Sequence, residues 1–584
     1  MIAIITDNRR IAKEIAHSLE IDLKKQDEGY YQGRGYMLVW TEDELISLVP
    51  TVEPNRKRLV SDDLPFIPQS FVLTPCKQQN GKGVLTDKLA LQQLKVIKKV
   101  FDACQSIIVA TEASERGELH FRRIYEYLNC DKPFKRVWLN SLTAKAIRES
   151  FQNLQESSRY DNLYAAADCR EKANYLLNTN IDLAFAIAVG IKHYPPGRLQ
   201  TPVLAMVDKR YFEHRNFKSS YFYEVRMALK KRGNIRKFKI KESIKNKHKA
   251  NKIYEQLKTF EEAKITKVDI QMAVQLPPLL YNLSELQKDT HLRYGFSAKK
   301  TMEIARKLYE EKLISFPITD SRRIPKTVFI ETLKNIRQPA LYCDFADKLP
   351  LVEQEKPNRH SVGDVSYTEH HAIIPTGVRP TYLSNDDKSI YTLIVARTLE
   401  AFAPNCRKNT THIEATCGNL VLTSKVSEVR HLGWRSILNR EEDREEDEVR
   451  EGSTVPMFAK RELVRITGWS LLTRKTQPQP LHTETSLLSA MEAFSLGTPE
   501  TRTETIESLL SGKYIQRREQ NLVPTEKGGF FYCCVEKMRI ANAKLTGNWE
   551  KRLIGIGLGK QKANSFMKTF KVFTKQAADE ILTL

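Results

Sequence analysis

Acidic side chains follow an apolar run in the first third of the chain, where they could bind a divalent cation. Residues 106–111 (SIIVAT) are typical of a buried strand, and Glu112 and Glu118 follow in the next loop and helix start. In open α/β sheets the residues that follow a strand lie at its carboxyl end, the usual place for a ligand site. Carboxylate oxygens are the hard ligands that Mg²⁺ prefers. The alternative is that these acids only begin the next helix or solvate the surface.

The net charge favours a polyanionic partner. The 584 residues include 93 Lys and Arg against 71 Asp and Glu, which gives a formal net charge of +22. Nucleic acid is the leading candidate for such a partner, although excess lysine can also simply solvate a surface. No run approaches the ~20 apolar residues of a membrane span, and the nine cysteines include no C-x-x-C pair. We therefore expect a cytosolic protein with no membrane anchor, zinc ribbon or disulfide framework.

The elements that must position the acidic loop alternate between strand and helix. Residues 2–6 are predicted to form a strand, and apolar residues at helical spacing follow between 11 and 19. A second unit has a helix around 94–101, the strand at 106–111 and a helix around 121–128. The N-terminal region is therefore predicted to be α/β.

The remaining segments alternate between helical and β-type patterns. They are a mainly helical region at 148–210 that ends in a turn at 194–198, a β-type region at 221–270, a helical region at 282–390, a second β-type region at 411–466 and helices at 483–584. A basic run at 230–252 is either a solvated face or a DNA contact, and an acidic run at 440–448 is predicted to be an exposed loop.

Seven short motifs appear in a fixed order along the chain. They are 197–202 (GRLQTP), 277–281 (PPLLY), 295–298 (GFSA), 319–322 (TDSR), 370–376 (HHAIIPT), 497–502 (GTPETR) and 522–528 (LVPTEKG). Each alone is a weak signal, but their order and spread make coincidence very improbable. Together they resemble the type IA DNA topoisomerase family, most closely its topoisomerase III branch.

The resemblance implies a multidomain fold that combines α/β, α and β units in a toroid with an N-terminal Toprim domain. The implied parts are a Toprim domain at 1–150, a helical DNA-groove domain at 151–212 and 478–584, a discontinuous β-rich arch at 213–276 and 396–477, and a helical domain at 277–395 that carries the position of the catalytic tyrosine. The two separated β-type regions suit such an arch.

Residues 313–322 (LISFPITDSR) resemble the active-site segment of the family without its nucleophile. Where the family pattern is I-x-Y-P-R-T-D-S-R, this chain has Phe316 and Ile318. In the family the tyrosine attacks a backbone phosphate and forms a 5′-phosphotyrosine, and the arginine would steady the phosphate by charge-assisted hydrogen bonds. Phenylalanine has no oxygen to attack with. Tyr309 lies two helical turns earlier, ~10 Å away along a helix, and we expect it to be a poor substitute.

The acidic positions of the family are altered as well. Asp7 stands in place of a longer acid, and Asn8 in place of a lysine. Glu112 and Glu118 keep their acidity, whereas Ser114 occupies the second acidic position. By resemblance, the positions of the catalytic set are Asp7, Phe316, Ile318 and His370, and those of the metal site are Glu112, Ser114 and Glu118. Binding of Mg²⁺ is therefore expected to be weak or lost.

The residues that this chain retains are mostly of a DNA-binding kind. By resemblance, the DNA path is lined by Arg198, Gln200, Thr319, Ser321, Arg322, Thr498 and Arg502. Groups that face phosphates give affinity without reading sequence. For each of them the alternative is a structural hydrogen bond. We favour the phosphate role for the three arginines and the structural role for His371.

Three functions follow from these observations. The favoured one is a type IA homologue that binds single-stranded DNA, cannot cleave it through a tyrosine, and works in the cytoplasm, at the nucleoid, beside an active topoisomerase or other DNA-processing proteins. The second is an active enzyme that relaxes or decatenates DNA through a replacement nucleophile. The third is a structural or assembly protein whose basic surface contacts another protein. Joint changes at several active-site positions favour natural loss of cleavage over a single engineered change.

Overall fold

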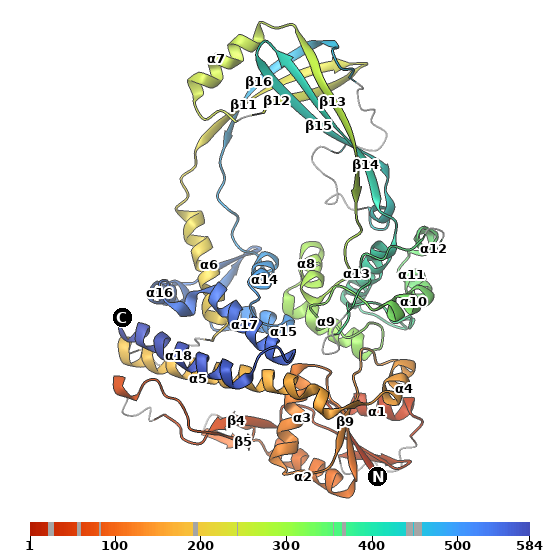
Figure 1. Cartoon of the computed structure of the whole chain (residues 1–584), viewed down its shortest axis with the longest axis vertical. Helices are drawn as coiled ribbons and strands as arrows, with labels where there is room; N and C mark the ends of the chain where they lie inside the picture. Colours follow the sequence, from red (N-terminus) through yellow and green to blue (C-terminus); the bar gives the residue numbers. More distant parts are fainter. Residues whose placement is uncertain are drawn as a thin grey trace.

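The chain folds into units that form a ring around an open centre (Figure 1). The computed structural model describes residues 1–21, 29–54, 60–80, 83–190, 197–241, 243–353, 356–364, 370–439, 448 and 458–584. An α/β unit lies at the base, helical units lie above it on both sides, and a β-barrel closes the ring at the top.

The α/β unit is built on a sheet whose central strands are parallel. In spatial order it contains β10 (Gln155–Glu156), β9 (Phe134–Arg136), β8 (Ser106–Ala110), β1 (Ile2–Thr6), β3 (Tyr36–Trp40) and β2 (Tyr30–Gly33). β1 pairs in parallel with both β3 and β8, and the two edge strands, β2 and β10, are antiparallel to their neighbours. The carboxyl ends of β1 and β8 therefore lie next to each other.

Helices cover both faces of this sheet. They are α1 (Arg9–Ser18), α2 (Lys88–Ala103), α3 (Glu115–Tyr127) and α4 (Ala144–Gln152). Side chains alternate along a strand, so Ala3 and Ile5 pack with α2 and α3 whereas Ile4 packs with α1 and α4. The predicted strands and helices of this region are confirmed. Two hairpins that the sequence analysis missed are β4 (Ile46–Pro50) with β5 (Phe71–Pro75), and β6 (Lys77–Asn80) with β7 (Gly83–Thr86).

One helical unit combines two distant parts of the chain. Its elements are α5 (Asp161–Val189), α6 (Gln200–Arg215), α14 (Glu484–Ala493), α15 (Pro499–Ser511), β17 (Ile515–Arg518), β18 (Asn521–Pro524), α16 (Glu526–Val535), α17 (Ala543–Gly557) and α18 (Ala563–Leu582). α5 and α18 run side by side (Figure 1), and a single core contains Leu177, Phe531 and Phe570. The two parts therefore depend on each other for burial.

The β-barrel also joins two separated segments. In order around the barrel its strands are β11 (Tyr221–Lys231), β12 (Asn234–Ile240), β15 (Leu420–His431), β14 (Cys406–Cys417), β13 (Glu262–Gln275) and β16 (Leu463–Lys475). Helix α7 (Lys247–Lys258) lies against it at the top of the ring (Figure 1). The two β-type regions that the sequence predicts thus pair with each other.

The second helical unit lies between the barrel and the α/β unit. It contains α8 (Leu283–Tyr294), α9 (Ala298–Glu310), α10 (Lys326–Asn335), α11 (Arg337–Tyr342), α12 (Leu349–Glu353) and α13 (Asn385–Phe402) around one core. The segments 313–324 and 370–376 pass between this core and the α/β unit.

Some sequence predictions need correction. The predicted boundary at residue 395 falls inside α13, because its buried face continues to Phe402, and the boundaries at 150 and 212 fall inside α4 and α6. The stretch at 483–584 is not all helical, since the β17–β18 hairpin interrupts it. Residues 194–196 and 440–447 lie outside the described residues. No helix in the described ranges has the length and apolarity needed to cross a membrane.

Candidate active site and DNA-binding surface

Phe316 lies at the seam where the second helical unit docks on the α/β unit. Its backbone N–H donates to the Asn140 carbonyl at 3.0 Å, and the residue is 5% exposed. The ring centroid lies 4.1 Å from that of His370 and 5.3 Å from that of Tyr309. The phenyl ring is therefore packed on two sides, and it brings no oxygen to the seam.

A cavity of about 230 Å³ beside Phe316 brings together two acids that the sequence singles out. Asp7 follows β1 and Glu112 follows β8, so both lie at the carboxyl edge of the sheet. Burial raises the pKa of Asp7 to about 7, and the charge of Glu112 adds to this rise. Burial, followed by the charge of Glu500, also raises the pKa of Glu112. Two carboxyl groups that resist ionisation thus share this cavity with the residue at position 316.

Ser114 serves here as a helix cap. Its Oγ accepts a hydrogen bond from the Gly117 N–H at 3.1 Å and donates one to Glu112 Oε1 at 2.6 Å. Gly117 is required at this turn, because a Cβ there would lie 2.0 Å from the Glu112 carbonyl oxygen. Asn8 caps α1 in the same way, since its Oδ1 accepts from the Ile11 N–H at 2.9 Å. Both positions therefore stabilise helix starts.

Glu118 is turned away from the cavity. It is 1% exposed, its Oε1 accepts from Arg122 Nε at 2.8 Å, and its Oε2 lies 3.5 Å from Arg136 Nη1. The predicted set of Glu112, Ser114 and Glu118 is therefore not gathered around one point. Across the described ranges, no group of three or more His, Cys, Asp and Glu residues is placed to hold a metal ion. Of the acids predicted from the sequence, Asp7 and Glu112 line the cavity, together with Glu42, Asp43, Glu44 and Glu310.

Tyr309 lies much closer to position 316 than the sequence predicts. Helix α9 ends at Glu310, and the chain then turns through Lys312 (φ 65°), so that 313–316 folds back beside the helix. The ~10 Å estimate was wrong because it assumed a helix that continues. Tyr309 lines the acidic cavity, and burial, then the charges of Glu112 and Asp7, raise the pKa of its phenol.

His370 is held on both ring nitrogens. Nε2 donates to the Ala113 carbonyl at 2.5 Å, and Nδ1 lies 2.6 Å from Asn140 Oδ1. Burial lowers the pKa of His370 to about 3. Thr319 supports the same segment, because its Oγ1 donates to the His370 carbonyl at 2.7 Å. In this arrangement His370 and Thr319 stabilise the seam.

The three arginines predicted to bind phosphates are engaged within the protein. Arg198 is buried, forms an ion pair with Glu550 and donates to Asn174 Oδ1 at 2.8 Å. Arg502 is also buried and pairs with Asp320 at 2.8 Å. Arg322 donates to the Leu280 carbonyl at 3.2 Å and lies 3.4 Å from Glu285. These guanidinium groups hold helices together in this conformation.

The other predicted DNA contacts are placed in or near a groove of about 740 Å³ between α3, α5, α15 and α17. Ile318, Thr319, Thr498 and Arg502 line it, and the Thr498 Oγ1 caps α15. Gln200 lies against Gly197 at the start of α6, and the Ser321 Oγ donates to the Arg323 carbonyl. Among the described residues that line this groove, nine are acidic and three are arginines. The negative charge of the groove therefore repels phosphates unless cations accompany them.

The positive charge is concentrated in the barrel. Residues 213–276 contain 17 Lys and Arg against 7 Asp and Glu, which accounts for +10 of the net +22. Exposed cations on β11, β12, α7 and their connections are Lys230, Arg232, Lys237, Lys239, Lys241, Lys245, Lys247, Lys249 and Lys252. Within the part of the chain that the structure describes, none of these nine side chains is paired with an acid. All nine residues belong to the basic run at 230–252 that the sequence marks as a solvated face or a DNA contact.

Comparisons with known proteins agree with this architecture. The family model described as DNA topoisomerase matches residues 158–568. Proteins named DNA topoisomerase 3 from Bacillus cereus (strain ATCC 14579) and Bacillus subtilis (strain 168) are 31% and 30% identical to this chain, over 99% of its length and 81% of theirs. The solved structure of full-length topoisomerase I from Thermotoga maritima superposes with a TM-score of 0.76 at 21% identity, covering 99% of this chain and 90% of that one.

Replacing Asp7 by Asn should change how stability depends on pH. The folded-state pKa of about 7 lies above the ordinary value of 3.8, so the carboxyl group contributes stability that is fully present below pH 4 and is lost as the pH rises through 7. The melting temperature of the wild type should therefore fall more between pH 5 and pH 8 than that of Asp7→Asn. Mg²⁺ at pH 8 should raise the melting temperature of the wild type only. Parallel curves for both proteins would contradict this assignment.

Glu550→Gln should destabilise the helical unit strongly. Although burial raises the pKa of Glu550, Arg170 and Arg198 outweigh it and hold the value at about 2. Removal of the carboxylate leaves the buried Arg198 without its acid and Arg170 with Glu115 alone, and breaking such a buried pair typically costs about 3–5 kcal/mol. The matched control is Glu580→Gln, which breaks the more exposed pair with Arg539 and should cost under ~1 kcal/mol. Equal urea midpoints for the two variants would exclude a structural role for Arg198.

Proposed function

The chain belongs to the type IA DNA topoisomerase family, on its topoisomerase III-like branch, and from this premise we propose that it binds single-stranded DNA without cleaving it through position 316. The observation that carries the proposal is Phe316 itself, which packs beside the acidic cavity where the family has its tyrosine. Ile318 lacks the arginine charge, and Asn8 and Ser114 are occupied as helix caps. Four positions that would serve cleavage thus have other roles or none.

The barrel provides the surface on which DNA would bind. Its unpaired lysines attract phosphates without reading sequence, and the counterions that they release make the affinity depend on salt. The acidic groove at the base would receive a strand less readily. We therefore assign the first contact with a single strand to β12, α7 and the connections around them, and place the protein in the cytoplasm, at the nucleoid, beside an active topoisomerase or other DNA-processing proteins.

Asp7 and Glu112 fit one weakly bound Mg²⁺. Two half-buried carboxyl groups with raised pKa values gain from a divalent cation, although Ser114 and Glu118 supply no third ligand. Bound there, Mg²⁺ would place positive charge beside a DNA phosphate. Asp7 and Glu112 would release their protons as they bind it. Arg116 and Arg306, which both donate to Glu500, add positive charge at the rim.

A second candidate function is cleavage through Tyr309. The specific observation in its favour is that its phenol lines the same cavity as Asp7 and Glu112, one ring away from position 316. Its raised pKa works against it, because a phenol that holds its proton is a weak nucleophile. We therefore rank it second to binding without cleavage.

Removing lysines from the barrel should weaken DNA binding and its salt dependence together. The triple variant Lys245→Gln, Lys247→Gln, Lys249→Gln should reduce the slope of log K against log salt by about 2, since each phosphate contact on a single strand contributes about 0.7. Binding is measured by fluorescence anisotropy with a labelled oligonucleotide. The control is Lys568→Gln, Lys571→Gln, Lys575→Gln, the same charge change on exposed residues of α18. Equal effects of both triples would place the contact elsewhere, and no binding at low salt would reject DNA as the partner.

No covalent adduct should form between this protein and a labelled oligonucleotide in the presence of Mg²⁺. Phe316→Tyr should not restore one, because position 318 has no arginine and the metal positions are incomplete. The measurement is gel electrophoresis under denaturing conditions. A Phe316→Tyr protein that forms an adduct or relaxes plasmid would refute the loss of the supporting groups. An adduct of the wild type that disappears in Tyr309→Phe would establish the second candidate.

A further inference from the structure

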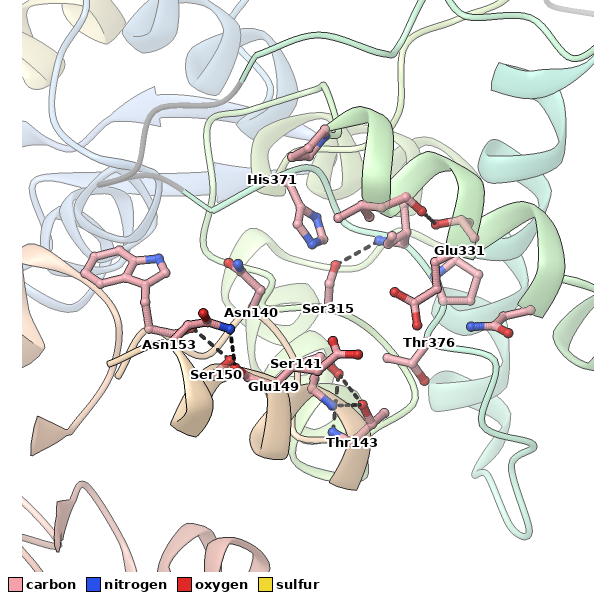
Figure 2. A pocket seen from close by; sticks show the side chains of 18 of the residues that line it. Asn140, Ser141, Thr143, Glu149, Ser150, Asn153, Ser315, Glu331, His371 and Thr376 are labelled. Carbon is pink, nitrogen blue, oxygen red and sulfur yellow. Dashed lines mark hydrogen bonds between the residues drawn. The ribbon is translucent and has the colours of Figure 1, made fainter. Parts of the chain in front are cut away.

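A second cavity lies on the opposite side of the seam from the acidic one. It measures about 530 Å³, and two separate parts of the chain form its walls. One wall comes from residues 138–160, which include α4, and the other from Ser315, α10 and residues 371–376. Figure 2 shows Asn140, Ser150 and Thr143 from the first wall facing Ser315, His371 and Thr376 from the second. The cavity is therefore complete only while the two units are docked.

Its lining is polar but almost uncharged. Asn, Gln, Ser and Thr side chains predominate, at Asn140, Ser141, Thr143, Ser150, Asn153, Gln155, Ser315, Thr332, Asn335 and Thr376. The carboxylates of Glu149 and Glu331 both form ion pairs with Lys145, and the Arg159 guanidinium donates a hydrogen bond to the Gln155 side chain. A charged ligand would gain little here, whereas a neutral ligand that both donates and accepts hydrogen bonds would gain much.

Two polar groups in this cavity have no protein partner among the described residues. His371 is 7% exposed and neutral, because burial lowers its pKa, and its Nδ1 donates to the Ala372 carbonyl at 2.8 Å. Its Nε2 is therefore left as an acceptor, and the ring lies at the edge of the cavity in Figure 2. The amide of Asn335 offers a donor and an acceptor side by side. His371 is buried and Asn335 is half-buried, so both groups are available to a ligand that enters the cavity.

We propose that this cavity binds a nucleobase, either at the end of a DNA strand or in a free nucleoside. A base carries N–H donors for His371 Nε2 and an edge of donors and acceptors that a carboxamide can pair with. The volume lies within the range typical of small-molecule sites. Trp138 and Tyr160 also line the cavity, and the Trp138 ring stacks between Tyr160 at 5.2 Å and His370 at 5.5 Å.

Occupancy would also hold the seam closed. Asn140 lines this cavity, accepts from the Phe316 N–H and contacts His370 through its side chain. Ser315 directly precedes Phe316 in the chain, and His371 directly follows His370. A base can bind only while the two units are docked, because both of them form the walls of the cavity. Binding therefore stabilises the docked arrangement. This inference does not depend on whether the chain cleaves DNA.

The test uses the full chain and titrates adenosine, guanosine, cytidine and thymidine by calorimetry, with ribose as the blank. At least one nucleoside should bind saturably and raise the melting temperature. Ala146→Phe, which fills the cavity from α4, should weaken that binding at least about tenfold. Gln152→Phe adds the same bulk at an exposed position of α4 outside the cavity and should leave it unchanged. Asn335→Leu removes the amide without adding bulk and should also weaken it.

Oligonucleotides distinguish the two sources of the base. A single strand with an intact terminal base is compared with one whose terminal nucleotide is abasic. If the strand end is the ligand, the abasic strand should lose affinity in the wild type but not in Ala146→Phe. If free nucleosides are the ligand, the two strands should bind alike while the nucleosides still bind. The proposal is overturned if no nucleoside and no strand end shows binding that Ala146→Phe and Asn335→Leu reduce.

Discussion

Docking of the second helical unit on the α/β unit is the constraint on which the functional regions of this molecule depend. Asn140 is central to it, because its carbonyl accepts from the Phe316 N–H and its side-chain amide meets His370. The Ala113 carbonyl accepts a hydrogen bond from Nε2 of the same imidazole. These few neutral hydrogen bonds fix position 316 beside the acidic cavity on one side and define the polar cavity on the other.

The phenylalanine at position 316 packs closely in this seam. A phenyl ring keeps the packing of a tyrosine against His370 and Tyr309, and only the hydroxyl is missing. Ser114 and Asn8 likewise stabilise helix starts at positions where charge would serve catalysis. The packing at these positions needs no nucleophile or extra charge, so the fold does not depend on them. The half-buried Asp7 and Glu112 remain beside position 316.

The net charge of +22 is not spread evenly: the groove at the base is acidic, whereas the barrel is basic. The groove at the base is predominantly acidic among its described residues, and its arginines pair with Glu550, Asp320 and other acids. The barrel carries unpaired lysines that face solvent. Since unpaired exposed charge attracts phosphates while buried paired charge stabilises helices, the same residue type has opposite roles in the two places.

The sequence by itself determined the strands and helices of the α/β unit, the presence of two separated β-type regions, the family, and the absence of an oxygen at position 316. These follow from local periodicity, motif order and residue identity. Only the tertiary structure decided that Tyr309 lies beside Phe316, that Glu118 turns inward, and that Arg198, Arg322 and Arg502 are used internally. Periodicity reports neighbours along one element, whereas the partner of a buried charge can be 380 residues away, as Glu550 is from Arg170.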